Sequence, residues 1–135
     1  MRAESLETRL MKRIGRKRGD VFLRADFRDL GGYDQVGRAL RGLVEKGKLL
    51  KIGQGLYTRA APSPFDGTPA PVKGLYSLTA EALGRLGVES TPTRFEQTYN
   101  TGKTTQVPAG RVIAVQKRVR RKIGYKGIFM SFERA

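Results

Sequence analysis

Apolar residues recur every three or four positions in three stretches near the start of the chain, the spacing of a helix with one buried face. They are Leu6, Leu10 and Ile14; Phe27 and Leu30; and Val36, Leu40, Leu43 and Val44. The pattern predicts helices over residues 4–16, 25–30 and 34–46, with Gly47 as the C-cap of the last.

A basic hairpin is predicted directly after these helices. Its parts are a strand over residues 48–52, a Gly-Gln-Gly bend at 53–55 and a strand over 56–59. Glycine tolerates the positive φ that a tight bend requires. Val21 and Phe22 form a short extended segment that we expect to pair with this hairpin. Three helices followed by a basic hairpin is the order of a winged helix-turn-helix domain, which we expect over residues 1–60.

The second half of the chain shows a different pattern. Residues 61–71 are rich in proline and predict an extended linker. A helix is expected over residues 77–87, with Ser77 as its N-cap and Leu78, Ala82, Leu83 and Leu86 as its buried stripe. A further short helical piece is expected over 95–100.

Alternating apolar positions near the C-terminus predict strands over residues 111–116, 119–123 and 128–133. We expect them to form an antiparallel β-meander. Residues 72–135 would then be a small basic α+β domain. The fold class predicted for the whole chain is α+β.

Lysine and arginine outnumber aspartate and glutamate by 27 to 12 in the 135 residues, a net charge of +15. The excess is +8 in residues 1–60 and +7 in 61–135, so neither half is merely a basic tail. Such a charge favours a polyanionic partner, nucleic acid above all, without selecting a sequence.

Histidine and cysteine are both absent from the sequence. This excludes disulfides, zinc fingers, thiolate nucleophiles and histidine acid–base chemistry. Because the carboxylates are scattered, we expect no catalytic residues, no metal, no cofactor and no enzymatic activity. No apolar run approaches the roughly 20 residues needed to cross a bilayer, and the N-terminus does not read as a signal peptide. We therefore expect a soluble cytoplasmic protein without a membrane partner.

The residues expected to contact DNA are polar or basic and lie in three places. They are Tyr33, Gln35, Arg38 and Arg41 on the 34–46 helix or at its start; Arg16, Lys17 and Arg18 in the loop after the first helix; and Lys51, Gln54 and Arg59 on the hairpin. Arginine can bridge O6 and N7 of guanine, and glutamine can bridge N6 and N7 of adenine. The alternative for each group is a solvated charged face without a ligand.

Six of the ten residues from 117 to 126 are basic: Lys117, Arg118, Arg120, Arg121, Lys122 and Lys126. They suit further contacts with a polyanion, either nucleic acid or an acidic protein; the alternative is charge that protects edge strands. Surface aromatic residues that could stack on bases are few, Tyr33 and Tyr99 at best, which argues against recognition of single strands.

Several short motifs in order resemble the AbiEi-type antitoxins of bacterial abortive-infection systems, which are short winged-helix regulators. The matching residues are Gly19-Asp-Val-Phe22, Asp26-Phe27, Leu30-Gly31, Ala39-Leu40, Leu43-Val44, Lys46-Gly47, Leu50-Lys-Ile52, Gly55-Leu-Tyr57 and Thr104-Thr-Gln-Val-Pro108. The resemblance implies a DNA-binding module that represses its own operon, encoded beside a toxin resembling a nucleotidyltransferase. The chain departs from that pattern at Gln54, where a basic residue is common. It is also shorter than members with a larger toxin-neutralising domain, which favours a regulator without antitoxin activity.

Three hypotheses follow. The first is a sequence-specific double-stranded DNA-binding protein that acts as a transcriptional autorepressor, with two copies in a homodimer reading an inverted repeat. The second is a protein-binding antitoxin whose residues 72–135 neutralise the toxin. The third is a basic RNA-binding protein without sequence-specific DNA readout.

Overall fold

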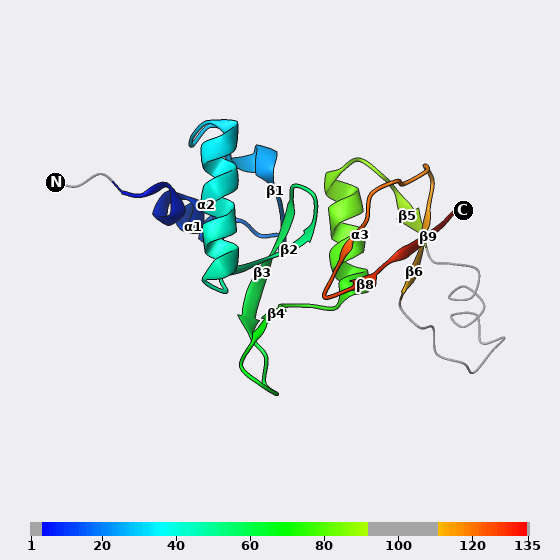
Figure 1. Cartoon of the computed structure of the whole chain (residues 1–135). Coiled ribbons are helices and arrows are strands. Elements are labelled where there is room, and N and C mark those ends of the chain that lie inside the picture. The colour runs from blue at the N-terminus through cyan, green and yellow to red at the C-terminus, as the bar shows by residue number, and fades with distance from the viewer. Residues whose placement is uncertain (1–3, 92–110, 135) are drawn as a thin grey trace. The chain divides into compact units, whose positions relative to one another are not determined.

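Helix and sheet are combined in both parts of the chain, and the α+β prediction is confirmed (Figure 1). The computed structural model describes residues 4–91 and 111–134. The chain divides into two compact units, Met1–Val72 (unit 1) and Lys73–Ala135 (unit 2). Among the described residues, no helix has the length and apolar character required to cross a membrane.

Unit 1 contains two α-helices, α1 (Leu6–Arg16) and α2 (Tyr33–Glu45). The first begins later than predicted because Ser5 is its N-cap, and the Ser5 hydroxyl accepts the Thr8 N–H at 3.2 Å. The second agrees with the predicted 34–46 to within one residue at each end. Gly47 follows it with φ +75°, a conformation that glycine adopts without strain.

The helix predicted over residues 25–30 is instead a single 3₁₀ turn, η1 (Arg24–Phe27). The Asp26 carboxylate accepts the Leu23 N–H at 3.0 Å, which caps the turn at its start. The chain then makes another tight turn, in which the Leu30 N–H donates to the Phe27 carbonyl. These i→i+3 contacts replace the i→i+4 ladder that a longer α-helix would need.

The sheet of unit 1 is antiparallel and has the order β1-β3-β2. Its strands are β1 (Val21–Leu23), β2 (Leu49–Gly53) and β3 (Leu56–Pro62). The predicted pairing of Val21 and Phe22 with the hairpin is confirmed, since they lie opposite Thr58 and Tyr57.

The helices of unit 1 pack on this sheet through the apolar stripes identified in the sequence. The buried residues are Leu10, Ile14, Phe22, Phe27, Val36, Ala39, Leu40, Leu43, Leu49 and Tyr57. Because α2 uses one side for this packing, its opposite side is left exposed to solvent.

The proline-rich stretch predicted as an extended linker over residues 61–71 instead turns back on itself at residues 64–66 and takes part in the sheet. Strand β3 continues to Pro62 and pairs antiparallel with β4 (Pro69–Pro71), with Ala61 opposite Ala70. Proline lacks an N–H donor and is therefore confined to sheet edges or strand ends. Pro62, Pro69 and Pro71 all lie at strand ends.

Unit 2 contains one helix, α3 (Leu75–Arg85), in its described part. It begins two residues before the predicted start, and its N-cap is Gly74 rather than Ser77, which lies within the first turn. Leu78, Ala82 and Leu83 are buried as predicted. The short helical piece predicted over 95–100 lies outside the described residues.

The β-meander predicted at the C-terminus is wrong. Strand β6 (Val112–Val115) lies between β5 (Ser90–Thr91) and β9 (Ser131–Arg134), and it pairs in parallel with β9. Parallel strands need a long connection, which residues 116–130 supply. No strand covers residues 119–123; instead the connection contains a small hairpin of β7 (Gly124–Tyr125) and β8 (Ile128–Phe129).

Candidate nucleic-acid interface

The exposed side of α2 carries the two arginines predicted to contact DNA. Arg38 and Arg41 lie three residues apart, so their side chains are neighbours on the helix surface, and both are exposed. No ion pair found among the described residues involves either one. Two guanidinium groups thus face solvent on one helix, although Asp34 and Glu45 share that side and reduce its net charge.

Gln35 has a structural task besides the predicted one. Its side-chain oxygen accepts the N–H of Gly32, the N-cap of α2, at 3.2 Å. This contact satisfies one of the N–H groups left unpaired at a helix start. A bidentate contact to adenine needs the same oxygen as an acceptor, so recognition by Gln35 would compete with the cap.

Arg24 of η1 lies against the first turns of α2, a position that sequence reasoning missed. Its guanidinium carbon is 3.4 Å from the centroid of the Tyr33 ring, and its Nε donates to the Tyr33 carbonyl at 3.1 Å. A Cβ at Gly37 would overlap the same guanidinium. The signal available in the sequence was Gly37 itself, since a glycine inside a helix often marks a close approach.

The same arginine connects η1 to the tip of the hairpin. The Arg24 N–H donates to the Gly55 carbonyl at 3.1 Å, and Gly55 adopts φ +69° at the bend. Burial raises the pKa of the Tyr57 hydroxyl, and the positive charges of Arg24 and Arg41 oppose that rise. Arg24 and Arg41 are therefore both close enough to the β3 tyrosine to act on it electrostatically.

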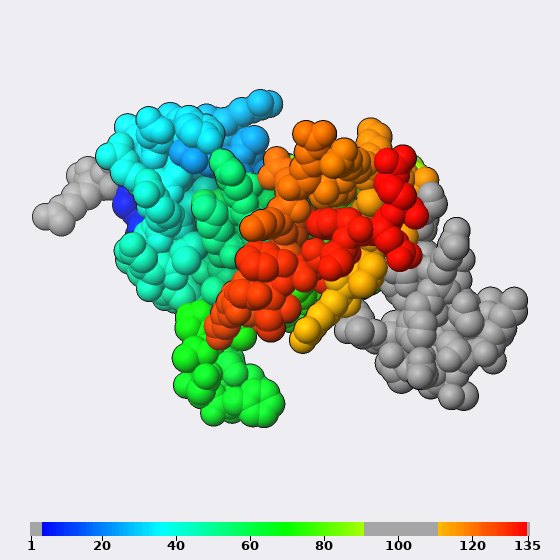
Figure 2. Space-filling view, turned by 45° about the vertical axis from the view of Figure 1, so that its right-hand side comes forward, coloured from blue at the N-terminus to red at the C-terminus, as the bar shows by residue number. Residues whose placement is uncertain are grey.

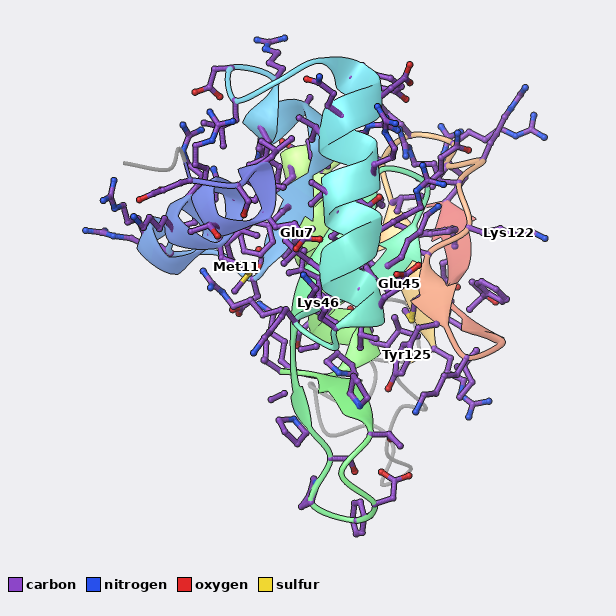
Figure 3. All side chains as sticks on the ribbon, turned by 60° about the vertical axis from the view of Figure 1, so that its left-hand side comes forward. Glu7, Met11, Glu45, Lys46, Lys122 and Tyr125 are labelled. Carbon is purple, nitrogen blue, oxygen red and sulfur yellow. The ribbon has the colours of Figure 1, made fainter. Side chains whose placement is uncertain are left out.

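A solvent-open groove of about 410 Å³ lies between α1 and α2, and Arg38 borders it. Its lining residues are Ser5, Leu6, Glu7, Arg9, Gln35, Arg38 and Ala39. Arg9 was not among the residues predicted to contact DNA, because the helical pattern indicates only that it is an exposed residue of the first helix. Among these lining residues, Glu7 forms an ion pair with Lys46 (Figure 3). The groove places Arg9 beside Arg38 and so adds a cation to the α2 surface.

Arg59 is held within unit 1 by several contacts. Its Nη2 donates to the carbonyls of Ile14 and Lys17, both at 2.7 Å, and of Gly19 at 3.2 Å. Its Nε is 3.3 Å from the Asp20 carboxylate, and its guanidinium carbon is 5.0 Å from the centroid of the Phe22 ring. These contacts connect β3 to the end of α1. The Arg59 guanidinium therefore already has partners within unit 1.

The remaining predicted contacts of unit 1 lie in two separate places. Lys51 on β2 and Gln54 at the hairpin bend are exposed. Arg16 and Arg18 near the end of α1 are exposed as well, whereas Lys17 is half-buried and its carbonyl accepts from Arg59. The hairpin and the α1–β1 loop therefore offer cations in addition to those of α2.

The six clustered cations of unit 2 lie in the connection between β6 and β8. Lys117, Arg118, Arg120, Arg121, Lys122 and Lys126 are all exposed. Residues 111–134, coloured from orange to red, lie together on the face drawn in Figure 2. These cations occupy a loop and a turn rather than edge strands of a meander, so protection of such strands does not explain them.

Comparisons with protein-family models, curated proteins and solved structures give no match to this chain. Within the described residues, no group of three or more carboxylates is placed to hold a metal ion. The features of the described residues that bear on function are therefore these basic surfaces.

Proposed function

We propose that the chain binds double-stranded DNA, with α2 in the major groove and the β2–β3 hairpin on the flanking backbone. The observation that supports this most is the exposed pair Arg38 and Arg41 on a helix whose other side is fully committed to the core. A major groove admits one α-helix, and arginine is the side chain that most often reads guanine there. In this proposal, unit 1 is a winged helix-turn-helix domain in which α1, η1 and α2 are the three helices.

The hairpin supports the same proposal through its anchoring. Its bend is tied to Arg24 through the Gly55 carbonyl, and its second strand is tied to α1 through Arg59. A hairpin held at both points keeps Lys51 at a fixed position relative to α2. Rigid placement matters because contacts to phosphates set the register in which the bases are read.

We further propose that the chain is a transcriptional repressor of its own operon, as its resemblance to AbiEi-type antitoxins implies, and that two copies read an inverted repeat. The test is fluorescence anisotropy with the DNA upstream of its own gene, a scrambled duplex and an RNA hairpin, across a salt series. The proposal expects a preference for the upstream DNA that persists as salt rises. Equal affinities that collapse together would mean that charge alone drives binding, and tighter binding to the hairpin would support an RNA-binding protein.

The resemblance also supports a second candidate, neutralisation of a nucleotidyltransferase-like toxin by unit 2. The separate compactness of unit 2 favours it, because that unit has its own buried residues, among them Leu78, Ile113 and Ile123. Co-expression with a toxin encoded next to this gene tests the idea. Growth arrest that persists in the presence of this protein would argue against neutralisation and leave regulation as its task.

A further inference from the structure

The β7–β8 hairpin of unit 2 is a tight turn that displays apolar and basic side chains together. Lys126 and Gly127 connect the two strands, and both have positive φ, 52° and 77°. Positive φ at both central residues is the signature of a type I′ hairpin turn. Because the turn is this short, the residues next to it are held close to one another on the surface.

Phe129 is the aromatic residue that this hairpin exposes. The alternation along residues 128–133 predicts opposite faces for Ile128 and Phe129, yet the two residues are 44% and 49% exposed. Phe129 lies opposite Gly124 in the register, where a Cβ would overlap the Ile128 carbonyl oxygen. The missing side chain at Gly124 therefore lets β8 approach β7 closely, and the Phe129 ring lies partly over the space that a side chain there would occupy while it stays half-exposed.

The side chain of Lys122 lies close to this ring. The Lys122 ammonium lies 5.9 Å from the ring centroid, and its side chain extends from the segment that precedes β7 (Figure 3). Residues 111–134 carry eight basic side chains and one acidic one. The half-exposed aromatic ring thus belongs to a segment with a high density of positive charge.

We propose that this surface of unit 2 binds single-stranded nucleic acid, with one base stacked on Phe129 and the neighbouring phosphates bound by Lys122 and the cations of the 117–121 run. Single strands present free base faces, whereas a duplex buries them in its own stack. Flexible cations next to an exposed aromatic ring are the combination that single-strand sites use. An acidic protein would bind the cations equally well, but the exposed face of the Phe129 ring would contribute nothing to that binding.

This site is separate from the duplex-binding surface proposed for unit 1. The two share no residue, and Phe129 contributes nothing to α2 or to the β2–β3 hairpin. Loss of one activity therefore need not accompany loss of the other. Variants at Phe129 test the single-strand site alone.

The first experiment uses the full chain and two labelled strands of about 12 nucleotides, within the range of known single-strand site sizes. One is oligothymidylate, and the other is an abasic strand of equal length and charge. We expect the thymidylate to bind about tenfold more tightly, as one stacked base provides. Phe129→Ala should abolish this preference while leaving affinity for the abasic strand unchanged, and Phe129→Tyr should retain it.

A direct readout of stacking is available because the chain contains no tryptophan. Phe129→Trp would carry the sole indole, and stacking on thymine should quench its fluorescence, whereas the abasic strand should not. Phe65→Trp is the matched control, since Phe65 is exposed in unit 1 within the turn between β3 and β4. Its fluorescence should not respond to either strand.

Three results would overturn the proposal. Equal affinity for the two strands would mean that the cations bind backbone charge without stacking. If Phe129→Ala and the parent chain bound thymidylate with equal affinity, Phe129 would have only a structural role, packing over Gly124. Binding of polyglutamate as tight as that of thymidylate would indicate an acidic protein partner instead.

Discussion

The guanidinium of Arg24 lies over the ring of Tyr33, 3.4 Å from its centroid, and donates to the carbonyl of the same residue. This contact holds the start of α2 against η1, and Tyr33 remains 73% exposed. An arginine that stacks and donates at once is better placed than a lysine would be. The first turn of the proposed recognition helix is therefore oriented by a residue that lies outside it.

Gly37→Ala is expected to displace the Arg24 guanidinium, because the new methyl group would occupy its position. The helix gains about 1 kcal/mol from replacing glycine, but the cation–π contact, worth about 0.5–1 kcal/mol, is lost. Urea denaturation should therefore show little net stabilisation, and anisotropy should show weaker duplex binding. In an Arg24→Ala background the same change should stabilise by about 1 kcal/mol. An equal effect in both backgrounds would contradict the proposed contact.

Arg38→Ala is expected to reduce discrimination between the upstream duplex and a scrambled one. If Arg38 contacts a guanine, the substitution should weaken the free energy of binding by about 1–3 kcal/mol for the upstream duplex and by less for the scrambled one. Competition anisotropy at a fixed salt concentration measures both. Arg16→Ala is the matched control, since Arg16 is exposed at the end of α1 and should weaken both duplexes alike. An equal loss on both duplexes for Arg38→Ala would assign it to phosphate alone.

Arg59→Lys is expected to destabilise unit 1 by about 2–3 kcal/mol, because lysine cannot reproduce the three contacts to carbonyls and the ion pair with Asp20. Urea denaturation should show a lower midpoint with an unchanged slope. Arg18→Lys in the nearby exposed loop should change stability by less than about 0.5 kcal/mol. Equal effects of the two substitutions would mean that the carbonyl contacts contribute little.

The carboxylate of Asp29 should titrate below its ordinary pKa of 3.8, because Arg13 donates two hydrogen bonds to it, at 2.7 and 3.1 Å. A lowered folded-state pKa contributes stability that is complete above the ordinary value and is lost as pH falls through the folded value. Carbon-detected NMR titration measures this pKa directly. Arg13→Gln should return it toward 3.8. A pKa that stays low in that variant would assign the shift to another group.

The local sequence pattern was sufficient to predict those elements whose structure depends on residues close together in the sequence. Leu6, Leu10 and Ile14 predicted the buried face of α1, and the Gly53-Gln54-Gly55 bend predicted the turn between β2 and β3. Both depend on spacing and on backbone conformations that a few residues specify by themselves. Ser77 shows the limit of such signals. A good capping residue was present, yet the helix began earlier, at Leu75.

For the candidate site, the sequence identified the exposed residues of α2 but not the residues that support them. Arg38 and Arg41 followed from the helical period. Arg24 did not, because its place depends on how η1 packs against Gly37. Arg59 was predicted as a phosphate contact, whereas its guanidinium contacts the end of α1, more than forty residues away in sequence.

The sequence by itself determined the fold class, the two helices of unit 1, the hairpin that follows them and the polycationic character of the surface. Only the tertiary structure decided that β6 pairs in parallel with β9, that β4 extends the sheet from the proline-rich stretch, and that Phe129 is exposed beside Lys122. The physical reason is the range of the interactions. Helical period, turn conformation and charge are properties of neighbouring residues. Strand partnership and exposure instead depend on which distant segments bury one another's surface, and alternation along one strand does not carry that information.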